Sequence, residues 1–600
     1  MGVFDRLRKD YLFATGIGLA LIRVTPMARR RTRTFPDVMD ELAIRFADRA
    51  ALLSDRESLT YAELNARANR YARWAKANGV ARGDTVCLLM PNRPEFVAVW
   101  LGIARMGGVT GLLNTNLTGP ALAHCINIVA PKHVIVASEL CPAFDSAVPY
   151  LDCAPAIWTH GEGGSSGRPR IDEALAAFDD SPIPAGERPG LVHEDRCLHI
   201  YTSGTTGLPK AAKINHYRVL AAMEAFSAVM GVKADDRMYD CLPLYHTSGG
   251  VIAVCACLRE GASVFIRERF SASQFWNDVA EHGCTLFQYI GELCRYLVNA
   301  PPHPREGEHK LRLCCGNGLR PDIWTAFKTR FGIDHIREFY AATEGNAILF
   351  NIDDTPGSVG RVPRWAEFIF PMKVVRFDID REEPVRGDDG LCLECAPDEV
   401  GELISRIENN PLKPGQRFDG YSDKSATEKK ILRDAFAPGD LWFRSGDLMR
   451  RDARGYFFFV DRVGDTFRWK GENVSTSEVA ELLNTFPTVE EANVYGVRVE
   501  GQEGKAGMAA LVPGEGFDLA AFRQHVHASL SAYARPLFLR LQREIVTTST
   551  FKQRKLDLVR EGFDPEQVAD PIYFDDVSAG AYVPVDAALF HRIQSGELRL

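Results

Sequence analysis

The segment LHIYTSGTTGLPKAAK, from Leu198 to Lys213, places a short β-prone run directly before a loop rich in glycine and hydroxyl side chains. From Tyr201 onward it carries two glycines, four serine or threonine hydroxyls, one proline and two lysines. Backbone N–H groups and hydroxyls that follow a strand and precede a helix can wrap an anion, so the segment predicts a phosphate-binding loop between a strand and a helix. The pattern GxxxxGK[ST] is absent, so the loop is not of the Walker A type.

Helical and strand patterns alternate on both sides of this loop. YAELNARANRYARWAKANGV (61–80) has apolar residues at helical spacing, and DTVCLLM (84–90) is typical of a buried strand. The runs KHVIVAS, LHIYTS and ASVFI repeat the strand pattern. Strands separated by helical crossovers predict a mixed α/β fold with layers of helices on parallel sheets.

The length of the chain predicts several subdomains, because 600 residues exceed what one ordinary core holds. A β-rich region is expected at 368–407, and a new βαβ-like pattern begins at Gly464. We expect an N-terminal segment (1–34), a large domain of layered βα subdomains (35–463), a small mobile α+β domain (464–575) and a tail (576–600). The boundary falls at a glycine, which can absorb a large change in backbone dihedrals.

The composition is that of an ordinary soluble enzyme. Hydrophobic residues make up 46% and charged residues 25% of the chain, and the net charge of -8 does not predict nucleic-acid binding. Fourteen dispersed cysteines do not resemble a disulfide framework and favour a reducing, cytoplasmic compartment. Cys392 and Cys395 form a lone CxxC, which favours buried strand residues over a zinc site.

The N-terminal segment combines an apolar run with a basic run. YLFATGIGLALIRV (11–24) is fourteen residues long, short of the roughly 20 that a membrane-spanning helix needs. No small-residue cleavage site precedes Arg29, Arg30, Arg31 and Arg33, so a signal peptide is not predicted. Two alternatives stay open, a helix on an anionic membrane surface and a helix packed on the body of the protein.

Two further stretches carry carboxylates in positions suited to a nucleotide. REFYAATEGN sets Thr343 and Glu344 before a glycine, and a carboxylate beside polyphosphate is a common way to hold Mg²⁺. Asp447 in GDLWFRSGDL is suited to accept hydrogen bonds from a ribose diol, or else belongs to a solvated turn.

Together, YTSGTTGLPK, FYAATEGN, FRSGDL and DRVGDTFRWKGENVS have the order and spacing of the adenylate-forming acyl-CoA synthetase superfamily. LPLYHTSG, CCGNGLRPDIW, YARPLFLRLQ and TSTFKQRK resemble the fatty acid transport protein branch, bacterial type, whose members are long-chain and very-long-chain acyl-CoA synthetases. The resemblance runs from about Ala50 through the tail YVPVDAALFHRI. It implies ATP, Mg²⁺ and coenzyme A.

The resemblance also implies a role for each matched residue. Tyr340 matches an aromatic that stacks on adenine, Asp447 the ribose-binding aspartate, and Arg462 a ribose or phosphate contact. The implied catalytic residues are Lys552, Thr343, Glu344 and His246, the last beside the acyl carboxylate, and the implied metal ligands are Glu344 and Thr202. The implied set for ATP and coenzyme A is Thr202, Ser203, Gly204, Thr205, Thr206, Gly207, Lys210, Gly316, Asn317, Gly318, Tyr340, Asp447, Arg462 and Gly471.

The catalytic lysine departs from the usual pattern of the superfamily, T-x-S-G-K. Residues 548–552 keep the threonine four positions before the lysine but have threonine and phenylalanine in place of serine and glycine. Lys552 is the best match and Lys555 is the alternative. Rotation about Gly464, where many relatives have Asp or Lys, would withdraw Lys552 and bring 469–471 to a pantetheine channel.

The predicted function is an AMP-forming long-chain fatty acid:CoA ligase, which makes acyl-AMP and then acyl-CoA and thereby supports fatty acid uptake. The expected location is the cytoplasm, peripheral to the inner face of the cell membrane through residues 11–34, with a homodimer among the expected states. Two alternatives remain: a ligase that loads acyl-AMP onto a carrier protein, and a membrane fatty acid transporter without catalysis.

Overall fold

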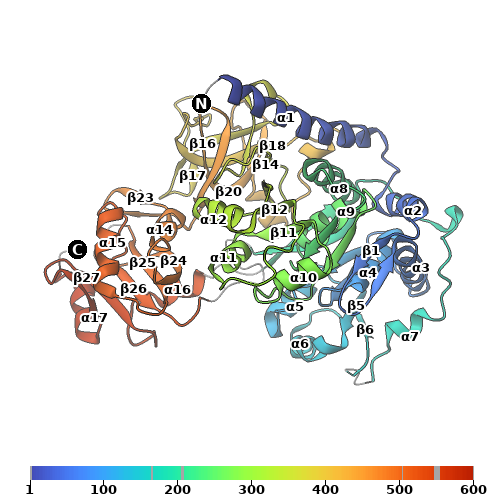
Figure 1. The fold of residues 1–600 in the computed structure, drawn as a ribbon, viewed down its shortest axis with the longest axis horizontal. Helices are drawn as coiled ribbons and strands as arrows, with labels where there is room; N and C mark the ends of the chain where they lie inside the picture. The colour runs from blue at the N-terminus through green and yellow to red at the C-terminus, as the bar shows by residue number, and fades with distance from the viewer. Residues whose placement is uncertain (1–2, 164–166, 204–208, 503, 546–554, 599) are drawn as a thin grey trace. The chain divides into compact units, whose positions relative to one another are not determined.

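The computed structural model describes residues 3–163, 167–203, 209–502, 504–545, 555–598 and 600 (Figure 1). The chain divides into two compact units. Unit 1 comprises Met1–Phe370, Ser405–Arg433 and Leu441–Phe443, and unit 2 comprises Pro371–Ile404, Asp434–Asp440 and Arg444–Leu600. Both sides of the expected boundary at Val463–Gly464 belong to unit 2, and the domain limits expected from the sequence stay a prediction.

Unit 1 contains a six-stranded sheet whose order is β6-β5-β3-β4-β7-β8. Its first five strands are parallel neighbours, and β8 pairs antiparallel with β7. The strands are β6 (Ala156–His160), β5 (His133–Ala137), β3 (Thr85–Leu89), β4 (Val109–Leu112), β7 (Arg196–Ser203) and β8 (Pro209–Asn215). The buried runs at 84–90 and 133–137 are therefore strands, as predicted.

A second sheet of unit 1 has eight strands, and its six central strands are parallel. Their order is β14 (Ile348–Asn351), β13 (His335–Ala341), β12 (Leu313–Asn317), β11 (Leu286–Ile290), β9 (Arg237–Asp240), β10 (Ser263–Ile266), β1 (Ala50–Leu53) and β2 (Ser58–Thr60). Helices such as α11 (Gly291–Asn299) and α12 (Pro321–Phe331) connect successive parallel strands (Figure 1). The predicted α/β fold with parallel sheets is confirmed.

The helix predicted at 61–80 is α3 (Tyr61–Ala77). The side chain of Thr60 accepts a hydrogen bond from the N–H of Glu63, whose carboxylate accepts one from the N–H of Thr60, so both groups cap the first turn. The helix ends before Gly79, whose φ of +73° suits glycine. α3 packs against α4 (Pro94–Arg105), where the hydroxyl of the buried Tyr71 donates a hydrogen bond to Glu95.

The sequence predicts that a helix follows the phosphate-binding loop within residues 201–210, which we call the opening loop. This prediction is wrong. The loop connects the antiparallel strands β7 and β8, with Thr202 opposite Lys210, and α8 (His216–Met230) begins only after β8. The segment around Tyr421 also bonds to β8, through Ser422 N–H to the carbonyl of Ala211 and Lys213 N–H to the carbonyl of Gly420. The N-terminus of α8 therefore does not lie at the end of this loop.

The N-terminal run forms α1 (Val3–Val24), followed by a short 3₁₀ helix at Thr25–Arg29. The helical stretch Phe4–Arg29 is long and apolar enough to cross a membrane, so the fourteen-residue estimate from the sequence was too short. One side of α1 packs on unit 1 through Phe13 and Ile17, and the helix contacts α8. The alternative of packing on the body thus holds for that side of the helix.

Unit 2 begins with a sheet in which β21, β20, β18, β16 and β17 are successive neighbours. These strands are β16 (Met372–Asp378), β17 (Glu383–Pro384), β18 (Val400–Arg406), β20 (Leu441–Arg451) and β21 (Tyr456–Arg462), which agrees with the β-rich region expected from 368. The hairpin of β22 (Phe467–Trp469) and β23 (Glu472–Val474) follows.

The C-terminal part of unit 2 is built on a five-stranded sheet with the order β24-β25-β26-β27-β28. The strands are β24 (Val489–Val497), β25 (Ala506–Pro513), β26 (Phe538–Leu541), β27 (Ile572–Asp576) and β28 (Ala581–Pro584), and the helices are α14 (Thr476–Leu483), α15 (Leu519–Ser529), α16 (Leu556–Glu561) and α17 (Ala587–Gln594). The predicted βαβ-like pattern after Gly464 therefore corresponds to real elements.

Candidate active site

Polar side chains from β7, from β8, from the segment after β13 and from the segment around Tyr421 lie close together beside the opening loop. The Tyr421 hydroxyl donates a hydrogen bond to Glu344 Oε1, and the Thr202 hydroxyl bonds to Tyr421. The ammonium of Lys210 lies 5.6 Å from the centroid of the Tyr421 ring. We call Thr202, Lys210, Glu344 and Tyr421 the Tyr421 cluster. It unites three residues predicted from two separate motifs, and burial together with Glu344 raises the pKa of Tyr421.

Positive charge gathers at this cluster. Burial lowers the pKa of Lys210, and the ammonium groups of Lys430 and Lys429 lower it further, while Asp423 and Glu344 act in the opposite direction. A bound polyphosphate would relieve the repulsion among these three cations, because an anion stabilises the charged form of each. The electrostatics of the cluster therefore favour an anionic ligand.

Thr343 is held in place by its neighbours in unit 1. The guanidinium of Arg218 donates to the carbonyl oxygens of Thr343, at 2.7 Å, and Gly345. The hydroxyls of Thr343 and Thr247 lie 3.2 Å apart, which brings the residue after His246 next to the TEG turn. His246 directly precedes a π-helix at Thr247–Ala253.

The predicted adenine segment lies at the carboxyl ends of parallel strands. Gly316 and Asn317 end β12, Tyr340 lies near the end of β13, and His246 follows β9. The carboxyl ends of parallel strands share one edge of a sheet, where ligands of α/β proteins bind. A Cβ on Gly316 would lie 2.2 Å from the carbonyl oxygen of Tyr289, so only glycine fits there.

A buried carboxylate secures the turn that follows β12. Glu338 accepts hydrogen bonds from the Tyr289 hydroxyl at 2.6 Å and from the N–H of Leu319 at 3.1 Å. Burial raises the pKa of Glu338 to about 8. Because Leu319 directly follows Gly318, Glu338 fixes the turn that the sequence assigned to adenine.

Asp447 and Arg462 are partners across the β20–β21 hairpin of unit 2. They are paired in register, and Arg462 Nε lies 3.9 Å from Asp447 Oδ1. The part of β20 before Asp447 is held by Glu402, which is fully buried and accepts hydrogen bonds from the N–H of Gly446 at 3.1 Å and from Arg444. The predicted ribose aspartate is thus backed by a carboxylate that no motif indicated.

A network of hydroxyls surrounds the predicted hinge. Gly464 has a φ of +91°. The buried carboxylate of Asp461 accepts hydrogen bonds from the hydroxyl of Thr466 at 3.1 Å and from the N–H of Thr476 at 2.7 Å. Lys555, the alternative catalytic lysine, donates to the Thr476 hydroxyl at 2.5 Å and lies 3.5 Å from Asp465.

The remaining predicted residues fall in two groups. Gly471 occupies the β22–β23 turn with a φ of +83°, beside Lys470, whose ammonium lies 5.8 Å from the ring centroid of Trp469. Lys552, Gly204, Thr205, Thr206 and Gly207 lie outside the described residues, as does the side chain of Ser203.

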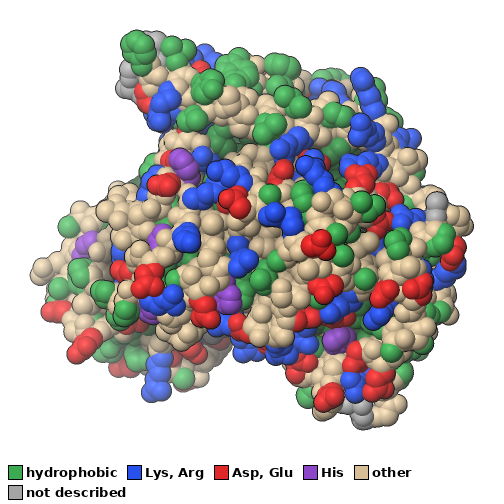
Figure 2. Space-filling view, turned by 45° about the vertical axis from the view of Figure 1, so that its right-hand side comes forward, with side chains coloured by type: hydrophobic (Ala, Val, Ile, Leu, Met, Phe, Trp, Pro, Cys, Tyr) green, Lys and Arg blue, Asp and Glu red, His purple; other side chains and the backbone are tan. Residues whose placement is uncertain are grey.

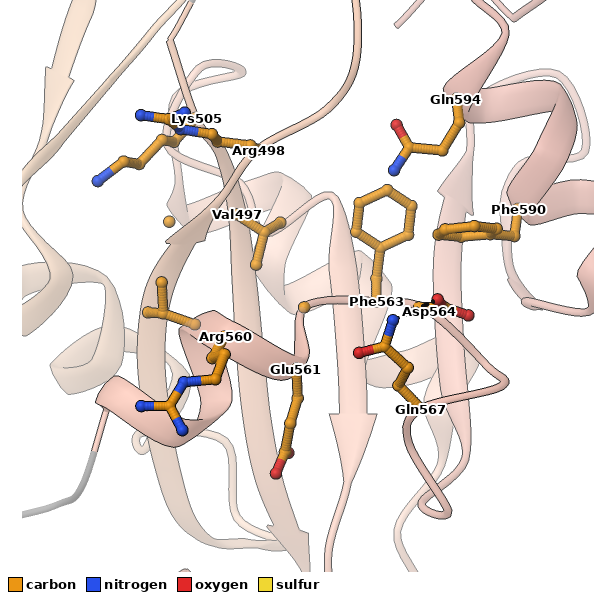
Figure 3. Close-up of a pocket in the computed structure, with 13 residues that line it drawn as sticks. Val497, Arg498, Lys505, Arg560, Glu561, Phe563, Asp564, Gln567, Phe590 and Gln594 are labelled. Carbon is orange, nitrogen blue, oxygen red and sulfur yellow. Dashed lines mark hydrogen bonds between the residues drawn. The ribbon is translucent and has the colours of Figure 1, made fainter.

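A separate cavity of about 480 Å³ lies in the C-terminal part of unit 2 (Figure 3). Lys505, Arg498 and Arg560 line one side of it, and Phe563 and Phe590 line its interior. No residue predicted from the sequence to bind ATP, Mg²⁺ or coenzyme A lines this cavity.

Among the described residues no group of three or more His, Cys, Asp or Glu side chains could enclose a metal ion, Cys392 and Cys395 included. Mg²⁺ bound to phosphate needs only one or two protein oxygens. Glu344 Oε2 has no hydrogen bond among the described residues, so this carboxylate fits a magnesium ion carried by a nucleotide.

The motifs missed the residues that hold the predicted ones. Tyr421 and Arg218 carry no signal that could be recognised without the fold. Glu402 stands in the strand pattern VGELIS, where an acidic residue in a buried strand is the one hint that sequence offers. Glu338 offers the same hint within REFYA.

Parallel sheets that gather hydroxyls, a lysine, a carboxylate and a glycine turn at their carboxyl ends define a nucleotide-binding α/β enzyme. The sequence matches the AMP-binding enzyme family over residues 39–409 and the AMP-binding enzyme C-terminal domain over residues 478–552. The chain therefore belongs to the AMP-binding enzyme family, the adenylate-forming acyl-CoA ligases that use ATP and coenzyme A.

Known relatives agree with this assignment. The chain is 42% identical to long-chain fatty acid transport protein 6 of Mus musculus over 556 residues, which cover 92% of this chain and 89% of that protein. It is 42% identical to long-chain fatty acid transport protein 1 of Homo sapiens over 594 residues, which cover 97% and 91%. The predicted superfamily and its fatty acid transport protein branch are confirmed.

Solved structures share the fold. The complex of the anthranilate CoA ligase AuaEII with anthranoyl-AMP superposes with a TM-score of 0.74 at 23% identity and covers 88% of this chain and 96% of that one. A Mycobacterium tuberculosis fatty acyl CoA synthetase gives a TM-score of 0.62 at 23% identity, with 88% and 98% covered. The predicted arrangement of a large N-terminal and a small C-terminal domain is that of adenylate-forming enzymes.

Proposed function

We propose that this chain is an AMP-forming long-chain fatty acid:CoA ligase, with very-long-chain acids among its substrates. The observation that carries the proposal is the Tyr421 cluster, where a lysine, a threonine and a carboxylate converge beside the opening loop. The names of the relatives that are 42% identical to the chain support a long acyl chain. Each buried CH₂ of such a chain stabilises binding by about 0.8 kcal/mol.

In the first half-reaction the fatty carboxylate attacks the α-phosphorus of ATP, and pyrophosphate leaves. Negative charge grows on the phosphate oxygens, so preorganised donors stabilise the transition state. Lys210 and the hydroxyls of Thr202 and Thr343 supply such donors, and His246 orients the carboxylate. Lys552 neutralises both anions and holds them in line.

The carboxylate of Glu344 would hold Mg²⁺, with Thr202 as a second contact. When bound, the ion supplies positive charge to the leaving pyrophosphate. Tyr421 fixes one oxygen of Glu344 by its hydrogen bond, and the other oxygen would be available to bind the ion. Asp447 and Arg462 bind the ribose, and Tyr340 stacks on the adenine next to the glycine turn at 316–318.

In the second half-reaction the thiol of coenzyme A attacks the acyl carbonyl and displaces AMP. Lys552 must leave the site first, and a rotation about Gly464 supplies this movement. The turn at Gly471 then lines the pantetheine channel. The homodimer stays a prediction.

The N-terminal helix would hold the enzyme at the inner face of the cell membrane, where fatty acids arrive. Conversion to the thioester traps the acyl chain on a polar, charged carrier, which would couple activation to uptake. This role needs catalysis, in contrast to a transporter that lacks it.

The decisive experiment measures pyrophosphate release across fatty acids of increasing length, with and without coenzyme A. Release that depends on long acids supports the proposal, and release without any dependence on acid would overturn it. Replacing coenzyme A by a phosphopantetheinyl carrier protein tests the carrier-loading alternative. Lys552→Ala should slow acyl-AMP formation more than Lys210→Ala, and the reverse order would reject the assignment of Lys552.

A further inference from the structure

α1 has two apolar faces, and only one of them packs on the protein. Phe13 and Ile17 are buried against unit 1, whereas Phe4 is 89% and Ile22 71% exposed. Five exposed apolar residues and the half-buried Gly18 follow helical spacing along the opposite side: Phe4, Leu7, Tyr11, Ala14, Gly18 and Ile22. Among them, Leu7 and Tyr11 are also more than half exposed. We call these six residues the outer stripe.

A second apolar element lies beside α1. Phe13 contacts Trp365 edge-on at 5.6 Å and Phe370 at 6.3 Å, so the segment 364–370 is in contact with the helix. Trp365 is 49% and Phe368 82% exposed. Figure 2 shows hydrophobic side chains along the top of the view, the part where Figure 1 places α1. Helix and segment together present more exposed apolar and aromatic surface than isolated surface residues do.

Polar contacts hold α1 against unit 1. The guanidinium of Arg23 pairs with Glu260 at 2.6 Å and donates to the Ser227 hydroxyl. The carboxylate of Asp10, on the packed side, pairs with Arg361 at 2.5 Å. These contacts hold the middle and the C-terminal end of the helix against unit 1, so the outer stripe is left on the side away from these contacts.

The cations near this surface fall into two sets. Arg31 pairs with Glu194 at 2.7 Å and Arg33 pairs with Glu41, so both are engaged with the protein itself. Exposed arginines without an ion pair among the described residues border the outer stripe and the second element: Arg6, Arg29, Arg30 and Arg364. The two carboxylates of α1, Asp5 and Asp10, are both paired with arginine.

We propose that the outer stripe, Trp365 and Phe368 form one surface that binds the interface of an anionic lipid bilayer with α1 parallel to the membrane plane. Aromatic and aliphatic groups rimmed by unpaired arginines match the acyl boundary and the negative headgroups of such a bilayer. Arg6 lies in α1, Arg29 and Arg30 follow the helix, and Arg364 belongs to the second element, so cations accompany both apolar elements, as binding to an anionic surface requires. The inference rests on the proposed membrane association and adds its geometry, its second element and its four lipid-facing arginines.

The test measures partition of the full-length protein onto vesicles of phosphatidylcholine, with and without phosphatidylglycerol. Phe4→Ser/Tyr11→Ser and Trp365→Ser/Phe368→Ser should each lower the partition coefficient at least tenfold. The control Ile44→Ser/Val577→Ser, at sites 84% and 80% exposed, should leave it unchanged. Replacing the four unpaired arginines by glutamine should abolish the preference for phosphatidylglycerol, and Arg31→Gln should not.

A spectroscopic readout reports the second element directly. Of the eight tryptophans, all in the described part of the chain, Trp365 is the exposed one, so brominated lipids should quench its fluorescence. Trp365→Phe should remove that quenching and keep acyl-CoA synthesis from a dispersed fatty acid.

The contrary outcomes distinguish failure of the proposed lipid-binding surface from failure of the membrane association itself. Binding that survives both apolar pairs rejects this surface but leaves the membrane association, and absence of wild-type binding rejects both. Retention of wild-type protein in cell membranes after alkaline carbonate extraction would show that α1 spans the bilayer. A dimer that the stripe variants convert to monomer, with vesicle binding intact, would assign the surface to a second copy. Ligase activity with a dispersed acid is measured in every variant and tests the enzymatic proposal separately.

Discussion

Gly464 offers a test of the proposed rotation whose size follows from its backbone. Its φ is +91°, and the nearest atom to an added Cβ, outside its chain neighbours, is Glu382 Oε1 at 3.8 Å. Gly464→Ala therefore meets no clash and acts through backbone strain alone, which costs about 1–2 kcal/mol for a residue with Cβ at positive φ. That strain would depopulate this conformation about 5- to 30-fold relative to one with negative φ.

The two half-reactions should respond differently to this shift. We expect Gly464→Pro, which fixes φ near -65°, to keep acyl-AMP formation and stall thioester formation, with Gly464→Ala intermediate. Pyrophosphate exchange measures the first step, and thioester formation from synthetic acyl-AMP measures the second. Gly439→Ala is a matched control, since Gly439 has a φ of +83° and open space around it. Equal slowing of both steps, or normal turnover of the proline variant, would refute the hinge.

Three more predictions concern buried groups. Glu402→Gln removes the charge that holds the N–H of Gly446 and should raise the KM for ATP about tenfold, since a hydrogen bond to a charged group contributes about 1.5 kcal/mol; an unchanged KM in initial-rate assays would contradict this role. Tyr421→Phe frees Glu344 and should raise the Mg²⁺ concentration for half-maximal rate about fivefold, from a loss of about 1 kcal/mol, whereas a lower kcat with unchanged metal dependence would argue against it. Burial raises the pKa of Asp240 to about 8 from 3.8, so between these values the folded protein keeps a proton that the unfolded chain has released. The contribution of Asp240 to the free energy of unfolding is therefore fully present below about pH 4, and it falls by up to about 1.4 kcal/mol per pH unit as the pH rises to 8. Urea unfolding at several pH values should show that Asp240→Asn removes this slope. An identical slope in the variant would exclude Asp240 as its source.

Elements with local signals were predictable from the sequence. The helix at 61–80 was evident because its apolar spacing, its capping residues and Gly79 all agree. The buried strands at 84–90 and 133–137 were evident from continuous apolar runs. In contrast, β8 has small and charged residues, and it pairs with β7 on one side and bonds to a segment about 200 residues later on the other, which no local pattern can indicate.

The candidate site was likewise predictable where its residues stand in local motifs, and not where they depend on distant partners. Thr343, Glu344 and Asp447 stand in compact motifs, and their chemistry can be inferred from the residue types. Tyr421 and Glu402 act on those residues from distant parts of the chain, so only the fold reveals them. The length of α1 was underestimated because polar residues before Tyr11 continue the helix, which depends on packing rather than on an unbroken apolar run.

The motif residues are supported by three buried polar groups, Tyr421, Glu402 and Glu338. Because Tyr421 and Glu402 lie outside the conspicuous stretches of sequence, the motifs are short. Glu344 is held by Tyr421, the part of β20 before Asp447 by Glu402, and the turn after Gly318 by Glu338. Burying a carboxylate or a tyrosine hydroxyl costs free energy unless its hydrogen bonds are made, and here at least one bond of each group ends on the backbone of the site or on the functional side chain itself. These buried hydrogen bonds thus hold the donors and acceptors of the site in position before the ligand binds, so that little reorganisation is needed to reach the transition state. A motif residue without its support would keep its chemistry and lose its position.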